Sequence, residues 1–238
     1  MTQIYTKTGD QGNTQLREGQ RLNKSSLVFE VLGEIDELNC HLGRVQAMID
    51  GFVQHWRQLN QGLSQAVQGQ TQAFARQQKV VAGLQHLAVR LAEQQPHLMQ
   101  TSAILSLKHY PADQLQPFID YTQQLERQID HWQSRLPELH HFLLPGGHVL
   151  SAELMLTRAV CRRVERRLVK LVRVRGRGLT SQAAAQVTPA PLLAYFNRLS
   201  DWLFVISRHV NQLMGSTEQI WRGNQTNAAQ FQTDSQTV

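Results

Sequence analysis

Long stretches of helical periodicity constrain the fold of this chain more than any other feature. In three of them, hydrophobic residues recur every three or four positions, as they do on one face of an α-helix. The stretches run from about Ser26 to Asp50, from Ser151 to Val172 and from Leu192 to about Met214. Their apolar seams consist of Val28, Val31, Ile35, Leu38, Leu42 and Val45; of Leu150, Leu154, Cys161, Val164, Leu168 and Leu171; and of Leu192, Phe196, Leu199, Leu203, Ile206 and Val210. No stretch has a convincing strand pattern, so we predict an all-α fold, a bundle of about five helices with short connections.

The middle of the chain carries weaker helical patterns. We expect helices over about 80–93 and 113–135, with Pro96 interrupting the first and a short helix following over 98–107. Residues 51–80 are rich in glutamine and poor in bulky apolar residues, which indicates an insertion that either extends the flanking helices or forms a mobile arm. The expected organisation is an N-terminal loop (1–25), a helical bundle (26–214) and a flexible, polar C-terminal tail (215–238).

Composition narrows the class of protein. Hydrophobic residues make up 41% of the chain, enough for a real core, and the formal net charge of +6 favours an anionic partner such as a nucleotide, a nucleic acid or a membrane surface. The two cysteines, Cys40 and Cys161, exclude a disulfide framework and a zinc-ribbon spacing. The N-terminus has no signal-peptide pattern and no run of about 18 apolar residues occurs, so we expect a cytoplasmic protein without a membrane segment.

The helical stretch 151–172 has an unusual concentration of charge. Five arginines fall within the eleven residues 157–167. Helical spacing places Arg158, Arg162, Glu165 and Arg166 in a row beside the apolar seam. Taken alone, such a row is typical of a solvated basic face. Asp36, on the first predicted helix, is a candidate partner for one of these arginines.

Residues 6–14 form a loop rich in glycine and threonine. Glycine lets backbone N–H groups approach an anion closely, threonine hydroxyls donate hydrogen bonds, and Lys7 adds positive charge. Asp10 could orient a hydrated Mg²⁺. The spacing of a Walker A motif is missing, so in isolation the stretch is equally compatible with a simple turn cluster.

His140 and His141 precede a Pro-Gly-Gly turn and invite a metal interpretation. Glu138 and His141 form one Glu-x-x-His pair, but a di-iron bundle needs two such pairs on facing helices, and the sequence contains no second one. We therefore reject a di-iron site.

Five blocks of the sequence together resemble a known family. They are Thr6-Lys7-Thr8-Gly9-Asp10 with Gly12 and Thr14; Gly33 with Asp36-Glu37-Leu38-Asn39; Phe142 with Pro145-Gly146-Gly147; Arg158-Ala159-Val160-Cys161-Arg162-Arg163 with Glu165-Arg166-Arg167; and Asn197-Arg198-Leu199-Ser200-Asp201 with Leu203-Phe204. In content and order they are similar to the PduO-type ATP:cob(I)alamin adenosyltransferases. The sequence departs from the family pattern at Leu16-Arg17-Glu18-Gly19, where members commonly have a Leu-Phe-Gly-Gly-like run, and in the insertion 51–80.

The resemblance implies a homotrimer of five-helix bundles that transfers the 5′-deoxyadenosyl group of ATP to the cobalt of cob(I)alamin, with Mg²⁺ assisting, at sites between subunits. It implies ATP-binding roles for Thr6, Lys7, Thr8, Gly9, Lys24, Arg162, Glu165 and Asn197. It further implies that Arg158 pairs with Asp36 and that Phe142 lies beside the lower face of the corrin. Arg163 and Arg167 are then left as plain surface charge. A flavin reductase is the candidate electron donor, and neither a nucleic acid nor a membrane is an expected partner.

Two other classes of function remain as alternatives. A basic helical module could bind nucleic acid through the arginines between Arg158 and Arg177, although no aromatic stacking platform is interleaved with them. A non-catalytic trimeric scaffold would leave the Thr-Lys-Thr-Gly-Asp loop without a purpose.

Overall fold

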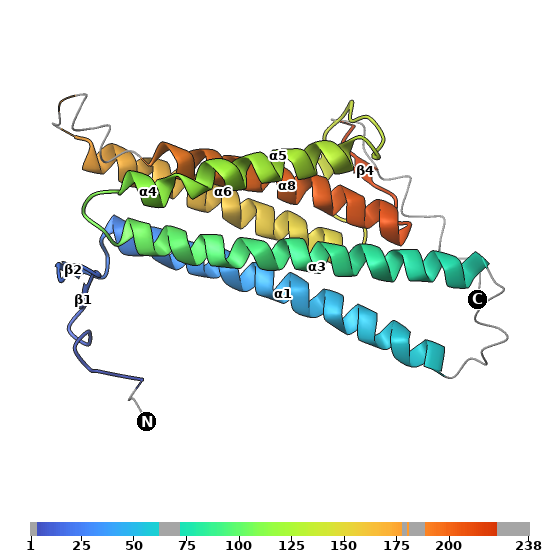
Figure 1. Cartoon of the computed structure of the whole chain (residues 1–238), viewed down its shortest axis with the longest axis horizontal. Coiled ribbons are helices and arrows are strands. Elements are labelled where there is room, and N and C mark those ends of the chain that lie inside the picture. Colours follow the sequence, from blue (N-terminus) through green and yellow to red (C-terminus); the bar gives the residue numbers. More distant parts are fainter. Residues whose placement is uncertain (1–3, 62–71, 178–179, 181–188, 223–238) are drawn as a thin grey trace.

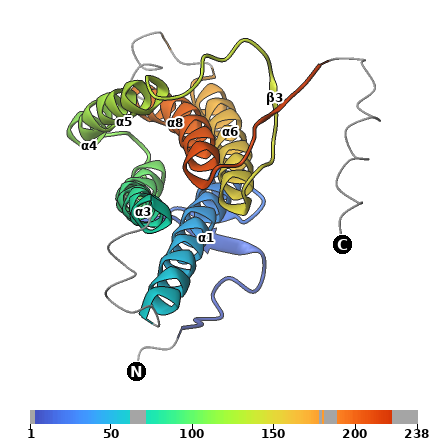
Figure 2. The same cartoon turned by 90° about the vertical axis from the view of Figure 1, so that its right-hand side faces the viewer.

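The computed structural model describes residues 4–61, 72–177, 180 and 189–222, which form an elongated helical bundle (Figure 1). Within these residues, five helices have 17 residues or more: α1 (Leu27–Gln61), α3 (Gln72–Leu105), α5 (Pro117–Gln133), α6 (Val149–Arg175) and α8 (Ala190–Met214). A single turn, α4 (Ala112–Leu115), precedes α5. Helix α6 packs against both α1 and α8, while α3 packs on α1 and α5 packs on α8 (Figure 2). The all-α prediction is confirmed.

The three predicted apolar seams form the centre of the bundle. Every one of their residues exposes 4% or less of its surface. Burying a large aliphatic side chain contributes about 1.5–3 kcal/mol, so these seams are a major source of the stability of the fold. Their shared burial explains why α1, α6 and α8 lie together.

Pro96 does not interrupt its helix, contrary to the expectation from sequence. Helix α3 runs through it from Gln72 to Leu105. An internal proline removes one backbone hydrogen bond and costs about 3 kcal/mol, but Leu91 and Leu98 on either side of it are both fully buried on the same face. Apolar burial along the whole helix therefore outweighs the local cost. The helix ends at Leu105, whose carbonyl accepts a hydrogen bond of 3.2 Å from Arg175.

The glutamine-rich segment extends the two flanking helices. Residues 51–61 continue α1 and residues 72–80 begin α3, while residues 62–71 lie outside the described part of the chain. Glutamine is a good helix former, so these turns persist with little apolar burial.

Two small antiparallel sheets, missed by the sequence analysis, decorate the ends of the bundle in the described residues. Strand β1 (Asn13–Gln15) pairs with β2 (Arg21–Asn23), and β3 (Leu143–Leu144) pairs with β4 (Gln219–Ile220). Ladders of two or three residues are too short to produce a periodic pattern. The β4 pairing also fixes the first residues of the expected C-terminal tail; residues 223–238 lie outside the description. None of the described helices is long and apolar enough to cross a membrane.

Candidate functional site

The N-terminal loop brings together most of the residues predicted to bind phosphate. The hydroxyl oxygens of Thr6 and Thr8 are 2.9 Å apart. A Cβ atom added to Gly9 would lie only 3.1 Å from the Nζ atom of Lys24, so glycine permits this lysine to pack against the loop. Lys7 has a positive φ of 59°, a conformation that non-glycine residues rarely adopt. The loop therefore presents hydroxyls and ammonium groups together on an exposed surface, a chemistry suited to an anion.

The β1–β2 hairpin supports this loop and contains the departure from the family pattern. Leu16 is 6% exposed, and its backbone N–H donates to the Gln20 carbonyl at 2.9 Å. Glu18 accepts a hydrogen bond of 3.0 Å from the backbone of Lys108, just after α3. The altered residues thus attach the hairpin to the bundle.

Helices α6 and α8 bring two of the predicted nucleotide-binding residues into contact. The Asn197 side-chain amide donates a hydrogen bond of 3.1 Å to the Glu165 carboxylate. Arg162, one turn before Glu165 on α6, is exposed. Together the three side chains offer a carboxylate, an amide and a guanidinium to a polar ligand at the seam between two helices.

Arg158 lies beside an open cavity of about 540 Å³ between α5, α6 and α8. Its guanidinium stands over the Phe204 ring, 5.3 Å from the ring centroid. Burial lowers the pKa of Arg158 and the charge of Arg162 lowers it further, while Asp201 acts in the opposite direction. A partly desolvated cation in such a position attracts a carboxylate or an anionic group of a ligand.

Asp36 is exposed on α1, and no ion pair joins it to Arg158 within the part of the chain that is described. The geometry explains this separation: Arg158 turns toward α8, where Phe204 lies, whereas α1 packs on another side of α6. One chain by itself therefore does not assemble the predicted Asp36–Arg158 pair.

Arg163 and Arg167 are not plain surface charge, contrary to the sequence-based interpretation. Arg163 pairs with Glu37, and Arg167 pairs with Glu30 at 3.1 Å. Both guanidinium groups also approach Glu34, at 3.7 and 3.4 Å. Burial raises the pKa of Glu34 while these two arginines act to lower it. The arginines thus tie α6 to α1, which periodicity could not show because it does not identify the neighbouring helix.

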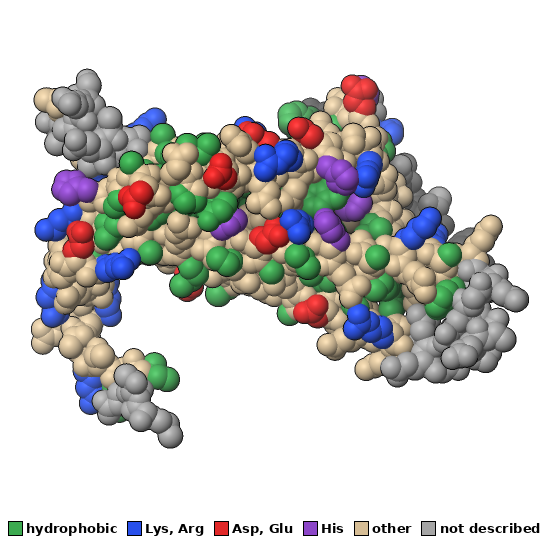
Figure 3. Space-filling view, viewed as in Figure 1, with side chains coloured by type: hydrophobic (Ala, Val, Ile, Leu, Met, Phe, Trp, Pro, Cys, Tyr) green, Lys and Arg blue, Asp and Glu red, His purple; other side chains and the backbone are tan. Residues whose placement is uncertain are grey.

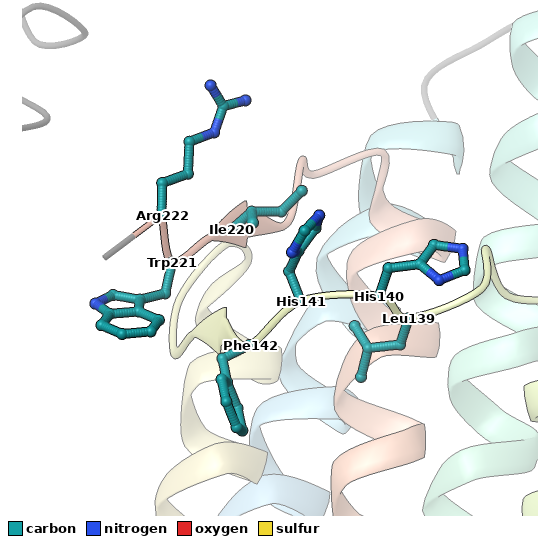
Figure 4. A pocket seen from close by; sticks show the side chains of 7 residues that line it. All are labelled: Leu139, His140, His141, Phe142, Ile220, Trp221 and Arg222. Carbon is teal, nitrogen blue, oxygen red and sulfur yellow. The ribbon is translucent and has the colours of Figure 1, made fainter. Parts of the chain in front are cut away.

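Phe142 lies in the loop between α5 and α6, at the opposite end of the bundle from β1 and β2 (Figure 1). Its side chain is 78% exposed and lines an open cavity of about 850 Å³ (Figure 4). The other lining residues are Leu139, His140, His141, Ile220, Trp221 and Arg222. Leu139 also lines the cavity beside Arg158, so the two cavities adjoin.

Sequence reasoning missed the residues that hold this loop. Asn211 of α8 accepts a hydrogen bond of 2.9 Å from the His148 backbone and donates one of 3.2 Å to the Gly146 carbonyl. Arg208, one turn earlier, pairs with Glu218 at 2.9 Å. The signal in the sequence was the Pro-Gly-Gly turn, which demands a partner but does not say which one.

Comparison with known proteins follows this geometry closely. A family model described as cobalamin adenosyltransferase matches residues 4–210. The chain is 34% identical to the corrinoid adenosyltransferase MMAB of Mus musculus, with 92% of this chain and 77% of the relative aligned. It is 31% identical to a cobalamin adenosyltransferase of Cupriavidus metallidurans, with 93% and 95% aligned.

Solved structures show the same likeness. A variant PduO-type ATP:corrinoid adenosyltransferase from Lactobacillus reuteri, complexed with cobalamin and ATP, superimposes with a TM-score of 0.66 at 27% identity. That comparison covers 93% of this chain and 97% of the other. A second variant of the same protein, complexed with ATP, gives a TM-score of 0.62 at 26% identity over 92% and 100% of the two chains.

Proposed function

Since the chain belongs to the cobalamin adenosyltransferase family, we propose that it transfers the 5′-deoxyadenosyl group of ATP to the cobalt of cob(I)alamin. The products are adenosylcobalamin and triphosphate. The observation that carries this proposal is the Glu165–Asn197 hydrogen bond beside Arg162, because it joins two distant sequence blocks of the family into one polar site.

The reaction needs little acid–base chemistry from the protein. The cobalt(I) electron pair attacks C5′ of ATP, a Co–C bond forms, and the C5′–O bond breaks with its electrons leaving on triphosphate. The cobalt is the nucleophile, so no activated serine, cysteine or general base is required. The protein aligns C5′ with cobalt and stabilises the charge of the leaving group.

The N-terminal loop and the α6–α8 seam divide the work of binding ATP. Lys7 and Lys24 neutralise the triphosphate, while Thr6, Thr8 and the backbone of Gly9 donate hydrogen bonds to its oxygens. Arg162, Glu165 and Asn197 bind the remainder of the nucleotide. These roles suit the exposed hydroxyls and ammonium groups of the loop and the polar pair on the helices.

Mg²⁺ is held mainly by the phosphate oxygens of ATP in this proposal. Among the described residues, no group of three or more His, Cys, Asp or Glu side chains could hold a metal ion. Asp10, exposed in the N-terminal loop, can accept a hydrogen bond from a water molecule of the hydrated ion. Bound there, the ion supplies further charge for the leaving triphosphate.

The site lies between subunits of a homotrimer. Asp36 and Arg158 are both accessible but face apart within one chain, as expected of partners that meet across an interface. Losing one member of a buried ion pair costs about 3–5 kcal/mol, so each residue also supports assembly. Asp36→Asn should therefore weaken corrinoid binding more than ATP binding.

Phe142 supplies an apolar surface beneath the corrin ring. Its exposed ring excludes water and a lower axial ligand from cobalt, which makes reduction of Co(II) to Co(I) easier. A flavin reductase supplies the electron. The free thiols of Cys40 and Cys161 suit the reducing conditions of the cytoplasm.

Formation of the Co–C bond tests the proposal directly. The purified chain is mixed with cob(II)alamin, a strong reductant, Mg²⁺ and ATP, and the absorbance change to adenosylcobalamin is followed. We expect turnover that requires both ATP and the reductant. Failure of adenosylcobalamin to form under these conditions would sink the proposal.

A further inference from the structure

We propose that an ion pair between Arg208 and Glu218 positions Phe142 and Trp221 as a two-ring apolar wall for the corrinoid. The inference rests on the proposed function and adds three residues to it. Trp221 becomes a second corrinoid contact, and Arg208 and Glu218 become positioning residues that act through the two chain segments carrying the rings.

The two rings lie together but open to solvent. Phe142 and Trp221 have their ring centroids 6.3 Å apart, with an interplanar angle of 68°. They expose 78% and 51% of their surfaces and line the same cavity (Figure 4). Exposed large aromatic side chains held against each other are typical of a surface that receives an apolar ligand.

The backbone joins the two rings by strand pairing. Leu143 pairs with Ile220 in the β3–β4 ladder, and the Trp221 N–H donates to the Phe142 carbonyl at 2.8 Å. The ladder has only two residues in each strand, which is too little to be stable by itself. Something else must hold the two segments in register.

Arg208 supplies this restraint from α8. Its side chain is 5% exposed and donates to both oxygens of Glu218, at 2.9 and 3.1 Å, just before β4. The same guanidinium donates to the Pro137 carbonyl at 2.9 Å, at the start of the loop that carries Phe142. A buried, forked guanidinium–carboxylate pair is among the strongest orienting contacts in proteins. One side chain thus connects both segments to the helix.

Asn211 anchors the far end of the same loop. It is 4% exposed and bonds both Gly146 and the backbone of His148, one turn along α8 from Arg208. The Phe142 loop is consequently held at both ends by adjacent turns of one helix. Removing the Glu218 charge should therefore loosen Trp221 and β4 while leaving the Asn211 anchor intact.

The experiment compares Glu218→Gln, Trp221→Ala and Trp221→Phe with the wild-type protein in the full adenosylation assay. Glu218→Gln keeps the side-chain volume but removes the charge, and Trp221 is exposed, so all three variants should fold. Glu218→Gln and Trp221→Ala should raise the KM for cob(I)alamin by roughly tenfold and leave the KM for ATP within about twofold. Trp221→Phe should restore most of the affinity.

A matched control and a spectrum separate positioning from general damage. Glu93→Gln removes a carboxylate that pairs with Arg90 at 2.9 Å on α3, and it should leave the corrinoid KM unchanged. The absorbance spectrum of bound cob(II)alamin should show a larger fraction with its lower ligand attached in Glu218→Gln and Trp221→Ala than in the wild type.

The outcomes distinguish this inference from the function beneath it. An active wild-type enzyme whose Glu218→Gln and Trp221→Ala variants match it in corrinoid KM and in cob(II)alamin spectrum would overturn the positioning role alone. An equal rise in the KM values for ATP and cob(I)alamin would also overturn it, because the damage would then be general. A wild-type protein that forms no Co–C bond would contradict both proposals.

Discussion

Gly147 shows how one residue can decide the shape of a functional loop. Its φ of +89° is unfavourable for side chains, and an added Cβ would lie 2.4 Å from Oδ1 of Asn211. Only glycine allows the Asn211 amide to approach and hold the turn that follows Phe142. The second glycine of Pro-Gly-Gly is thus required by a close contact as well as by its conformation.

Gly147→Ala should consequently destabilise the protein. Backbone strain and the displaced Asn211 hydrogen bonds together predict a loss of about 2–4 kcal/mol in the free energy of unfolding. Denaturant titration measures it. Gly51→Ala is the matched control, because this helical glycine has no atom within 4 Å of an added Cβ and the change should be neutral or stabilising by up to about 1 kcal/mol. Equal stability of the two variants would contradict the packing argument.

His97 makes the stability depend on pH. Burial lowers its pKa from 6.5 to about 4, and its ring stacks on Tyr121 with centroids 3.6 Å apart. The unfolded chain therefore binds the proton more tightly than the folded one, so stability is complete above about pH 6.5 and declines as the pH falls toward 4.

His97→Gln should remove this part of the pH dependence. Between pH 7.5 and pH 4, the wild type should lose roughly 2–3 kcal/mol more of its unfolding free energy than the variant does. Urea titrations at the two pH values supply the measurement, with exposed His55→Gln as a control that should follow the wild type. Parallel pH profiles for His97→Gln and wild type would show that His97 is not the responsible group.

Asn197→Ala tests the polar pair at the α6–α8 seam. Loss of the hydrogen bond to Glu165 should raise the KM for ATP several-fold and leave the KM for cob(I)alamin nearly unchanged. Gln212→Ala, which removes an exposed hydrogen bond elsewhere on α8, is the control and should change neither constant. A larger effect on corrinoid than on ATP would reassign Asn197 to the other substrate.

At the scale of single elements, periodicity predicted most of what the structure contains. The seams of α1, α6 and α8 were all identified because burial on one helical face leaves a direct trace in the sequence. The course of α3 through Pro96 was not, since the local rule for proline ignores apolar burial on both sides of it. The roles of Arg163 and Arg167 also escaped, because helical spacing does not reveal that the glutamates of α1 lie opposite them.

The ion pairs between α6 and α1 should contribute modestly to stability. Arg163 and Arg167 are each about two-fifths exposed, with side-chain exposures of 39% and 42%, so each pair is worth at most about 1 kcal/mol. The double variant Arg163→Gln/Arg167→Gln should lower the unfolding free energy by about 1–2 kcal/mol, and less at high salt. Thermal unfolding at two salt concentrations measures this, and exposed Arg166→Gln should have no such effect. A loss that does not depend on salt would indicate packing rather than charge.

At the scale of the whole molecule, charge is distributed in a way that disfavours binding to nucleic acid. Glutamates of α1 occupy Arg163 and Arg167, which interrupts the basic row of α6. On the face shown in Figure 3, acidic and basic side chains are interspersed rather than gathered into a stripe. Continuous phosphate binding requires the opposite arrangement.

The sequence blocks identified the members of the site but not how they assemble. The N-terminal loop and Phe142 lie at opposite ends of one bundle, and Asp36 and Arg158 face apart (Figure 1). Motifs record which residues a family uses, whereas their distribution over neighbouring copies depends on the surfaces that meet. A site completed by a second copy accounts for this division.

Mixing two inactive variants tests this central claim most directly. Asp36→Asn and Arg158→Ala should each be inactive alone, but in trimers formed from equal amounts of both, about one interface in four combines an intact Asp36 with an intact Arg158. Co-expressed chains should therefore recover up to roughly a quarter of the wild-type rate of adenosylcobalamin formation. If the two residues acted within one chain, every subunit would still lack one of them, and the mixture would remain inactive.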